Sequence, residues 1–445
     1  MWLAFYNCAV VFFQEITATL SDPGTQWIVF VCLGSYFLTF GLLQASLDAR
    51  SFWRTDNPTL WLSGMLVIGA LAYALNYGTA SQSVQAPILF AGAALGQGSA
   101  VWWIRRKRKV SGVRLPRMII GVVIVLLFAA SLWGAGPDAP FKYRGQARWS
   151  GPLHNPNLYG LLMGVGIALA AGASLLGLTR RVSDQLPAGH RRIAGGGYVA
   201  AVLYLVTVGF MSRALIYSYS RGAWIGSLCG LAYLIFRASK EFRAQGLRFD
   251  QRVTRNMVSI GLIAVSTVVL GFWHFRQTEW RPVQRTLSIA NMRDFSWRNR
   301  VLAWEGALQM MADRPWLGTG WNMPESLYQQ CYRPPKVEEG MAIQMNDYLM
   351  IGASLGLPAL ACFVVYLWLC FANSRGDPDW FQTICRSGAI VLAVGFWFDG
   401  GLFELPTAST FWILMGLGQT GSRTGQTGIL QNVAGKNDEA NGRGA

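Results

Sequence analysis

Residues 157–178, NLYGLLMGVGIALAAGASLLGL, contain no charged side chain. A helix rises about 1.5 Å per residue, so a segment of this length crosses the roughly 30 Å hydrocarbon core of a bilayer. Comparable apolar runs recur along the 445 residues, of which 52% are hydrophobic and only 13% charged. That is about half the charged fraction of an ordinary soluble domain. The sequence therefore predicts an all-α, polytopic membrane protein with about 11–12 transmembrane helices rather than a typical soluble enzyme.

Eleven apolar stretches are predicted to span the membrane. They lie at residues 27–46, 60–78, 86–104, 118–136, 157–178, 197–217, 222–236, 257–274, 347–371, 387–400 and 405–418. The shorter apolar stretch 2–14 is compatible with either a twelfth span or a helix at the membrane interface.

The connections between these spans differ in their content of Lys and Arg. Alternate connections, at 47–59, 105–117, 179–195, 237–256 and 373–386, together contain 21 such residues. On the opposite side, the long segment 275–346 contains only nine. Because basic loops remain in the cytoplasm, segment 275–346 is predicted to lie outside. This topology accounts for much of the excess of 38 basic over 22 acidic residues without a nucleic-acid partner.

Four regions follow from this topology. They are N-terminal transmembrane helices in 1–274, an outer helical arm in 275–346, C-terminal transmembrane helices in 347–418 and a disordered cytoplasmic tail in 419–445. In the arm, the spacing of apolar residues predicts a helix capped by Ser296 and ended by Arg314-Pro315. Gly318-Thr-Gly320 is predicted to form a turn, with a phosphate-binding loop as the alternative. Pro324 is predicted to open a second short helix that ends near Cys331.

Metal ligands and paired cysteines have no recognisable pattern in this chain. The three histidines are far apart, and the seven cysteines are scattered without a CxxC spacing. We therefore predict no metal site, no disulfide framework and no cofactor.

Polar residues mark three predicted helix starts on the outer side. A helix N-terminus offers unpaired N–H groups and the positive end of the helix dipole, and an arginine adds a planar charge that suits phosphate oxygens. The alternatives are a plain helix cap and an arginine that extends to the membrane interface. Arg213, near the end of its span, is predicted to face a polar cavity. The candidate substrate-binding residues at the three starts are Asn155 and Asn157, Ser220 and Arg221, and Arg298 and Arg300.

These stretches also form a recognisable series. The order GPLHNPNLYG (151–160), SRGAW (220–224), RVLAWEGALQMMADRPWLGTGWN (300–322) and MNDYLMIGASLGLPAL (345–360) resembles the O-antigen ligase and O-antigen polymerase superfamily of bacterial inner membranes. The resemblance covers roughly half of the chain and includes the long outer segment in the expected place.

This resemblance implies a metal-independent membrane glycosyltransferase of the inner membrane. Such enzymes transfer a glycan from undecaprenyl pyrophosphate to a glycan or lipid acceptor at the periplasmic face. By the same resemblance, Arg221 and Arg300 match family arginines, whose role would be to hold the pyrophosphate and to stabilise its charge as the sugar leaves.

The acceptor side departs from the family pattern. Met345 stands where family ligases carry a histidine that is proposed to activate the acceptor hydroxyl, and a thioether cannot accept that proton. Asp347 is a candidate replacement base, with helix capping together with Asn346 as the alternative. Asp399 and Glu404, in the outer turn DGGLFELP, are either bases or partners of an arginine.

A second class of function remains open. The alternative to a transferase is a transporter or flippase of a lipid-linked or anionic substrate, although transporters commonly show internal repeats and broken helices near the membrane midplane. Within the transferase class, the motifs do not separate ligation, polymerisation and protein O-glycosylation.

Overall fold

The computed structural model describes residues 55, 57–75, 85–109, 114–135, 141–143, 145–183, 194–244, 295–321, 323–334, 346–372 and 380–419. The predicted spans 27–46 and 257–274, the stretch 2–14, Met345 and the tail beyond residue 419 lie outside these residues.

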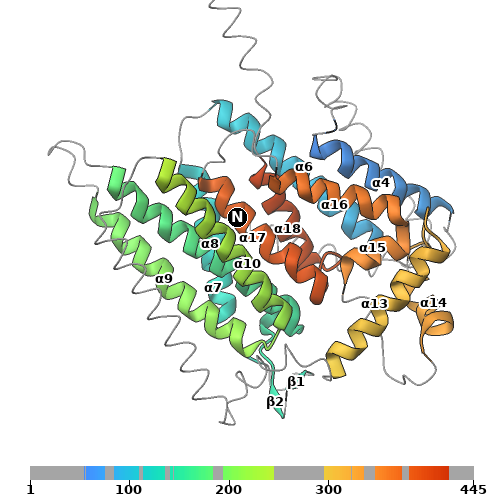
Figure 1. Ribbon diagram of the computed structural model, residues 1–445. Helices are drawn as coiled ribbons and strands as arrows, with labels where there is room; N and C mark the ends of the chain where they lie inside the picture. Colours follow the sequence, from blue (N-terminus) through green and yellow to red (C-terminus); the bar gives the residue numbers. More distant parts are fainter. Residues whose placement is uncertain are drawn as a thin grey trace, which may run out of the picture.

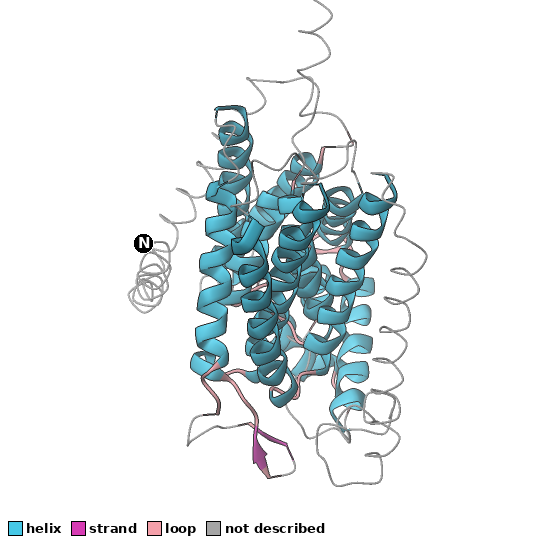
Figure 2. Ribbon diagram, turned by 90° about the vertical axis from the view of Figure 1, so that its left-hand side faces the viewer, coloured by secondary structure: helices cyan, strands magenta, loops and turns pink. Residues whose placement is uncertain are grey.

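The described chain is almost entirely helical (Figures 1 and 2). Three helices contain segments long and apolar enough to cross a membrane, Pro156–Leu175, Arg221–Lys240 and Trp380–Phe398, and shorter apolar helices accompany them. The predicted fold class, an all-α polytopic membrane protein, is thus confirmed. The α-helices are α4 (Pro58–Leu75), α6 (Gln85–Lys109), α7 (Arg114–Ser131), α8 (Pro156–Ser183), α9 (Ala194–Tyr217), α10 (Arg221–Ala244), α13 (Phe295–Asp313), α14 (Met323–Leu327), α15 (Asp347–Leu355), α16 (Leu357–Ala372), α17 (Trp380–Phe398) and α18 (Leu405–Gly418). The remaining elements are the 3₁₀ helix η1 (Gly151–Leu153), the π-helix η4 (Tyr328–Tyr332) and an antiparallel hairpin of β1 (Lys142–Tyr143) and β2 (Gln146–Ala147).

Helix α17 lies in the middle of the bundle and packs against α8, α10 and α18 (Figure 1). Its residues from Phe381 to Ala389 are all buried. In contrast, α9 and α10 expose large apolar side chains such as Leu203, Leu228 and Phe236. Since lipid rather than water surrounds such a surface, these side chains are where a membrane protein is expected to place them.

Glycines line the contact between α10 and α17. Gly222, Gly226 and Gly230 are four residues apart and therefore share one side of α10. A methyl group added at Gly226 would collide with the carbonyl oxygen of Val391, and one at Gly230 would lie 2.7 Å from the carbonyl oxygen of Ser387. Small residues let helix backbones approach closely in membrane proteins, and here they bring the start of α10 to the end of α17.

The predicted span 347–371 is broken. Helix α15 ends at Leu355 and α16 begins at Leu357, with Gly356 between them at a φ of 90° that glycine adopts without steric cost. The nine residues of α15 are too few to cross a bilayer, so that only α16 remains as an apolar helix of the predicted span.

The segment Gly318-Thr-Gly320 supports this break. The N–H groups of Thr319 and Gly320 donate to the carbonyl oxygens of Ala353, at 2.8 Å, and Ser354, at 3.0 Å. Irregular backbone at membrane depth is tolerated where other parts of the protein satisfy it. The turn interpretation of Gly318-Thr-Gly320 is therefore correct, because these two N–H groups already have acceptors.

The arm contains the two predicted helices. Helix α13 ends at Asp313, directly before Arg314-Pro315, while α14 and η4 continue to Tyr332. The prediction that Ser296 caps α13 is wrong, since the helix begins at Phe295 and Ser296 lies in its first turn.

The predicted start of α17 is also corrected. The helix begins at Trp380 rather than at residue 387, because Arg386 is accommodated inside it. Arg386 is buried, and its Nε atom donates to the carbonyl oxygen of Gly418, at 2.8 Å, at the C-terminal end of α18. A cation is favourable at a helix C-terminus, so Arg386 stabilises the bundle instead of lying in a loop.

The close contact of α10 and α17 gives a first prediction. We expect Gly226→Ala to destabilise the protein by about 1–3 kcal/mol, because the new methyl group overlaps the backbone of α17. Thermal unfolding of the purified protein in detergent should show a lower Tm. Gly209→Ala in α9 is the matched control, because no atom lies within 4 Å of the added methyl group. Equal Tm values for the two variants would contradict this account of the contact.

Candidate functional site

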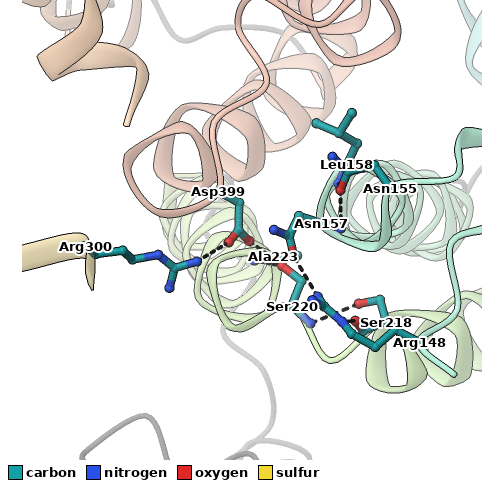
Figure 3. Close-up of polar contacts among 9 residues, drawn as sticks. All are labelled: Arg148, Asn155, Asn157, Leu158, Ser218, Ser220, Ala223, Arg300 and Asp399. Carbon is teal, nitrogen blue, oxygen red and sulfur yellow. Dashed lines mark hydrogen bonds and ion pairs between the residues drawn. The ribbon is translucent and has the colours of Figure 1, made fainter. Parts of the chain in front are cut away.

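Four segments that are distant in the sequence meet at one end of the bundle (Figure 3). They are the start of α8, the start of α10, the turn after α17 and the arm helix α13. Most of the predicted site residues belong to these segments.

The central contact is an ion pair between the arm and the bundle. The Nη2 atom of Arg300 lies 3.0 Å from Oδ1 of Asp399, and the side chains are only 6% and 1% exposed. A buried charge is tolerated when it is paired and hydrogen-bonded, so each side chain requires the other. The prediction that Asp399 pairs with an arginine is confirmed, and the pair fixes α13 to the end of α17.

Ser220 connects this pair to α10. Its hydroxyl donates to Oδ2 of Asp399 and accepts a hydrogen bond of 3.1 Å from the N–H of Ala223, as a helix N-cap does. Gly222 provides the space, because a methyl group there would lie 2.5 Å from Oδ2 of Asp399. The sequence Ser-Arg-Gly thus supplies a cap and a close helix contact, with Arg221 buried between them.

Arg221 and Arg300 are both buried at this end of the bundle. Arg221, 5% exposed, directly follows Ser220, and Ser220 shares Asp399 with Arg300. Both arginines are carried by helices, which hold them more firmly than loops would.

The start of α8 lies beside this cluster. Asn155 caps α8, with its Oδ1 atom accepting from the N–H groups of Asn157, at 2.9 Å, and Leu158, at 3.4 Å. The Oδ1 atom of Asn157 accepts a hydrogen bond of 2.6 Å from Nη2 of Arg148. Asn155 is thus a helix cap, whereas Asn157 belongs to a polar network that reaches the loop before η1.

Arg148 is a member of the site that the sequence did not reveal. Its Nε atom also donates to the carbonyl oxygen of Ser218, at 2.8 Å, in the turn before α10. Three basic residues lie in the loop 137–156, and nothing in their spacing distinguishes Arg148. The signal available was its position three residues before Gly151, where the first motif begins.

Asn346 and Asp347 form the start of α15. Asn346 caps the helix through a hydrogen bond of 3.1 Å from the N–H of Leu349. Its Nδ2 atom is buried and has no hydrogen-bond partner among the described residues. The Oδ2 atom of Asp347 accepts a hydrogen bond of 2.7 Å from the N–H of Leu402, so Asp347 holds the turn that carries Asp399.

The environment of Asp347 changes its acidity. Burial raises the pKa of its carboxyl group to about 8, the hydrogen bond from Leu402 opposes this rise, and the charge of Glu404 adds to it. At neutral pH this carboxyl group is therefore mostly protonated, and it becomes a proton acceptor as the pH approaches 8.

Three of the candidate residues lie outside the cluster. The guanidinium of Arg213 is exposed and lies 5.1 Å from the ring centre of Trp149, a cation–π contact in place of the expected polar cavity. Arg298 is exposed on α13, two residues from Arg300 and hence on another side of the helix. Glu404 is exposed at the N-cap position of α18, where its side chain makes no capping hydrogen bond.

Four aromatic rings from α13, α17 and α15 lie next to one another. Trp304 lies 5.7 Å from Trp297 and 5.8 Å from Trp397, and Trp397 lies 5.7 Å from Tyr348, measured between ring centres. Arg300 lies between the two tryptophans of α13 in sequence, and Asp399 follows Trp397 by two residues. We refer to these four rings as the aromatic wall. Trp297 and Trp304 lie three residues before and four residues after Arg300, so two rings of the aromatic wall share one face of α13 with Arg300.

Comparison with known families identifies the region that contains both Arg221 and Arg300. Residues 206–364 match the family model Wzy_C, described as O-antigen ligase. Over these residues the predicted resemblance to the O-antigen ligase and polymerase superfamily is confirmed. The match supports glycan transfer of the ligase or polymerase kind, with lipid-linked glycan and acceptor substrates in general. No curated protein matches the chain.

The O-antigen ligase match contains Arg221, Arg300 and Asp347, whereas Asp399 and Arg148 lie outside it. Tertiary structure therefore completes the cluster from both sides of the matched region.

The buried ion pair gives a second prediction. We expect Asp399→Ala to destabilise the protein by about 3–5 kcal/mol, because it leaves the guanidinium of Arg300 buried without its carboxylate. The double variant Arg300→Met/Asp399→Ala should recover part of this loss, since it removes both charges. The free energy of unfolding is measured in a denaturing detergent for the wild type, for each single variant and for the double variant. Glu404→Ala, at an exposed acidic residue five positions later, should cost no more than about 0.5 kcal/mol. Additive losses from the two substitutions would contradict the pairing.

Proposed function

We propose that this protein transfers a glycan from undecaprenyl pyrophosphate to an acceptor hydroxyl at the periplasmic face of a bacterial inner membrane, without a metal ion. In this reaction the bond between the anomeric carbon and the phosphate oxygen breaks, and undecaprenyl pyrophosphate leaves with the electron pair. A bond forms between the anomeric carbon and the acceptor oxygen, and the proton of that hydroxyl passes to a base.

One observation carries the proposal. The two arginines that match the family motifs are buried at the same end of the bundle, where Ser220 and Asp399 link the start of α10 to Arg300. A departing pyrophosphate carries several negative charges, and guanidinium groups stabilise them without protonation. Because the planar guanidinium binds two oxygens at once, arginine suits this task better than lysine.

In this proposal the two arginines have different supports. Arg221 stands at the first position of α10, where the helix dipole and the N–H groups of the first turn also favour an anion. Arg300 is held by Asp399, which fixes its orientation before substrate binds. Asp399 is thus a positioning residue for Arg300.

The acceptor would be activated at the start of α15. Asp347 is the candidate base in place of the family histidine, and the Nδ2 atom of Asn346 is a buried donor beside it. Both residues lie at the start of one short helix, which itself packs against the arm helix α13.

The aromatic wall suits the lipid part of the donor. Two of its rings share one face of α13 with Arg300, and Trp397 is 40% exposed. We infer that the isoprenoid units next to the pyrophosphate lie against these rings while the glycan extends outward. This outer side is predicted to be the periplasm, because the connections on the opposite side are rich in basic residues.

The arginine role gives a third prediction. With purified protein in liposomes and a synthetic polyprenyl-pyrophosphate glycan, Arg221→Ala or Arg300→Ala should lower the transfer rate on the order of 100-fold or more, because each removes charge stabilisation of the leaving group. Arg221→Lys and Arg300→Lys should recover only part of the rate, since lysine cannot bind two oxygens in the same way. The measurement is release of polyprenyl pyrophosphate together with appearance of the extended acceptor.

Arg314→Ala is the control, because Arg314 is exposed at the end of the same arm helix. Wild-type transfer by Arg221→Ala or Arg300→Ala would remove that residue from the mechanism. Movement of the intact lipid-linked glycan across the bilayer without cleavage would indicate a flippase instead.

Asp347 gives a fourth prediction, a pH dependence. Only the deprotonated carboxyl group accepts a proton, so the transfer rate should rise with pH and level off above about 8. Asp347→Asn should remove most of the rate but little stability, because the amide oxygen of asparagine still accepts the hydrogen bond from Leu402. An unchanged rate and pH profile in this variant would exclude Asp347 as the base.

A further inference from the structure

The hairpin before η1 packs against the turn that precedes α10. The N–H of Trp149 donates to the carbonyl oxygen of Tyr217, at 3.0 Å, and Nε of Arg148 donates to that of Ser218, at 2.8 Å. The hydroxyl of Tyr219 donates to Oε1 of Gln146, at 3.0 Å. The last residue of α9, Tyr217, and the two turn residues, Ser218 and Tyr219, are thus each held by the hairpin or by the two residues that follow it, immediately before Ser220 and Arg221.

The turn needs this support because its backbone is strained. Tyr219 has a φ of 53°, in the left-handed region that bulky residues rarely adopt, and its side chain is fully buried. Such a conformation persists only where the surroundings enforce it. The ring of Tyr143, from β1, lies 5.1 Å from the ring of Tyr219 and adds to the contacts that do so.

Arg148 also joins this turn to the start of α8. Its Nε atom donates to the carbonyl oxygen of Ser218, and its Nη2 atom donates to Oδ1 of Asn157, at 2.6 Å (Figure 3). A planar guanidinium presents its donors in a rigid fork, so these two bonds fix the turn relative to α8. A lysine has a single nitrogen and cannot reproduce this fork.

We propose that Arg148 is a positioning residue for Arg221. By holding the strained turn 218–219 against the start of α8, it sets where α10 begins and where the Arg221 guanidinium is presented. This inference rests on the proposed function of Arg221 in binding pyrophosphate. It adds Arg148 to Arg221 and Arg300 as a third arginine, which acts by positioning Arg221.

A first measurement tests the positioning itself, independently of catalysis. Hydrogen exchange of the purified protein should become faster at the amides of residues 218–223 in Arg148→Ala, because the variant loses the two hydrogen bonds that join the turn to the start of α8. Exchange in α17 should stay unchanged. Lys142→Ala is the matched control, since it removes a basic, exposed residue of the same hairpin. Unchanged exchange at 218–223 in Arg148→Ala would overturn the proposal.

A second measurement tests the coupling to Arg221. In the transfer assay, Arg148→Ala should lower kcat on the order of 10-fold to 100-fold with little change of KM for the acceptor, as expected for a misplaced catalytic group. In an Arg221→Ala background the same substitution should have little further effect, whereas a merely structural role would lower the rate equally in both backgrounds. Arg148→Lys should fall between wild type and Arg148→Ala, and it provides the test if the alanine variant does not fold.

The outcomes separate this inference from the function on which it rests. If Arg221→Ala is inactive while Arg148→Ala is as active as wild type, only the positioning role is overturned. Equal effects of Arg148→Ala in both backgrounds would also overturn it. If Arg221→Ala itself transfers glycan at the wild-type rate, the proposed function fails and the coupling to catalysis fails with it, while the exchange measurement still reports whether Arg148 holds the turn.

Discussion

The buried pair of Arg300 and Asp399 constrains the rest of this end of the molecule. Neither charge is tolerated in an apolar interior without the other, so the arm helix α13 must remain at the end of α17. Ser220 adds the start of α10 to the same carboxylate, and Asp347 holds the turn that follows it through Leu402. One carboxylate and its neighbours thereby organise four helices.

The helix packing below the site makes this arrangement possible. Carboxylate and helix start meet only because Gly222 leaves room for Asp399, and the glycines that follow along α10 bring its backbone close to α17. The break between α15 and α16 is also stabilised by irregular backbone. The carbonyl groups at the end of α15 accept hydrogen bonds from the loop after α13. Glycine and irregular backbone are thus used where segments of the site must approach each other.

Two helix caps, which depend on neighbours in the sequence, were predictable. Asn155 and Ser220 cap helices as expected, because a cap bonds to N–H groups only two or three residues away. Asp399 was expected to pair with an arginine, but 99 residues separate it from Arg300, and no sequence spacing selects that partner. Arg148 was missed for the same reason, because its contact with Ser218 spans 70 residues.

By itself, the sequence determined an all-α membrane protein with an O-antigen ligase-like series of motifs, since apolar length and helix caps are local properties. Only the tertiary structure decided that Arg298 is exposed whereas Arg300 is buried, that Gly318-Thr-Gly320 binds backbone carbonyls, and that a distant hairpin holds the turn before Arg221. The physical reason is that burial and pairing of a charge depend on which helices surround it, and that arrangement follows from the packing of the whole chain.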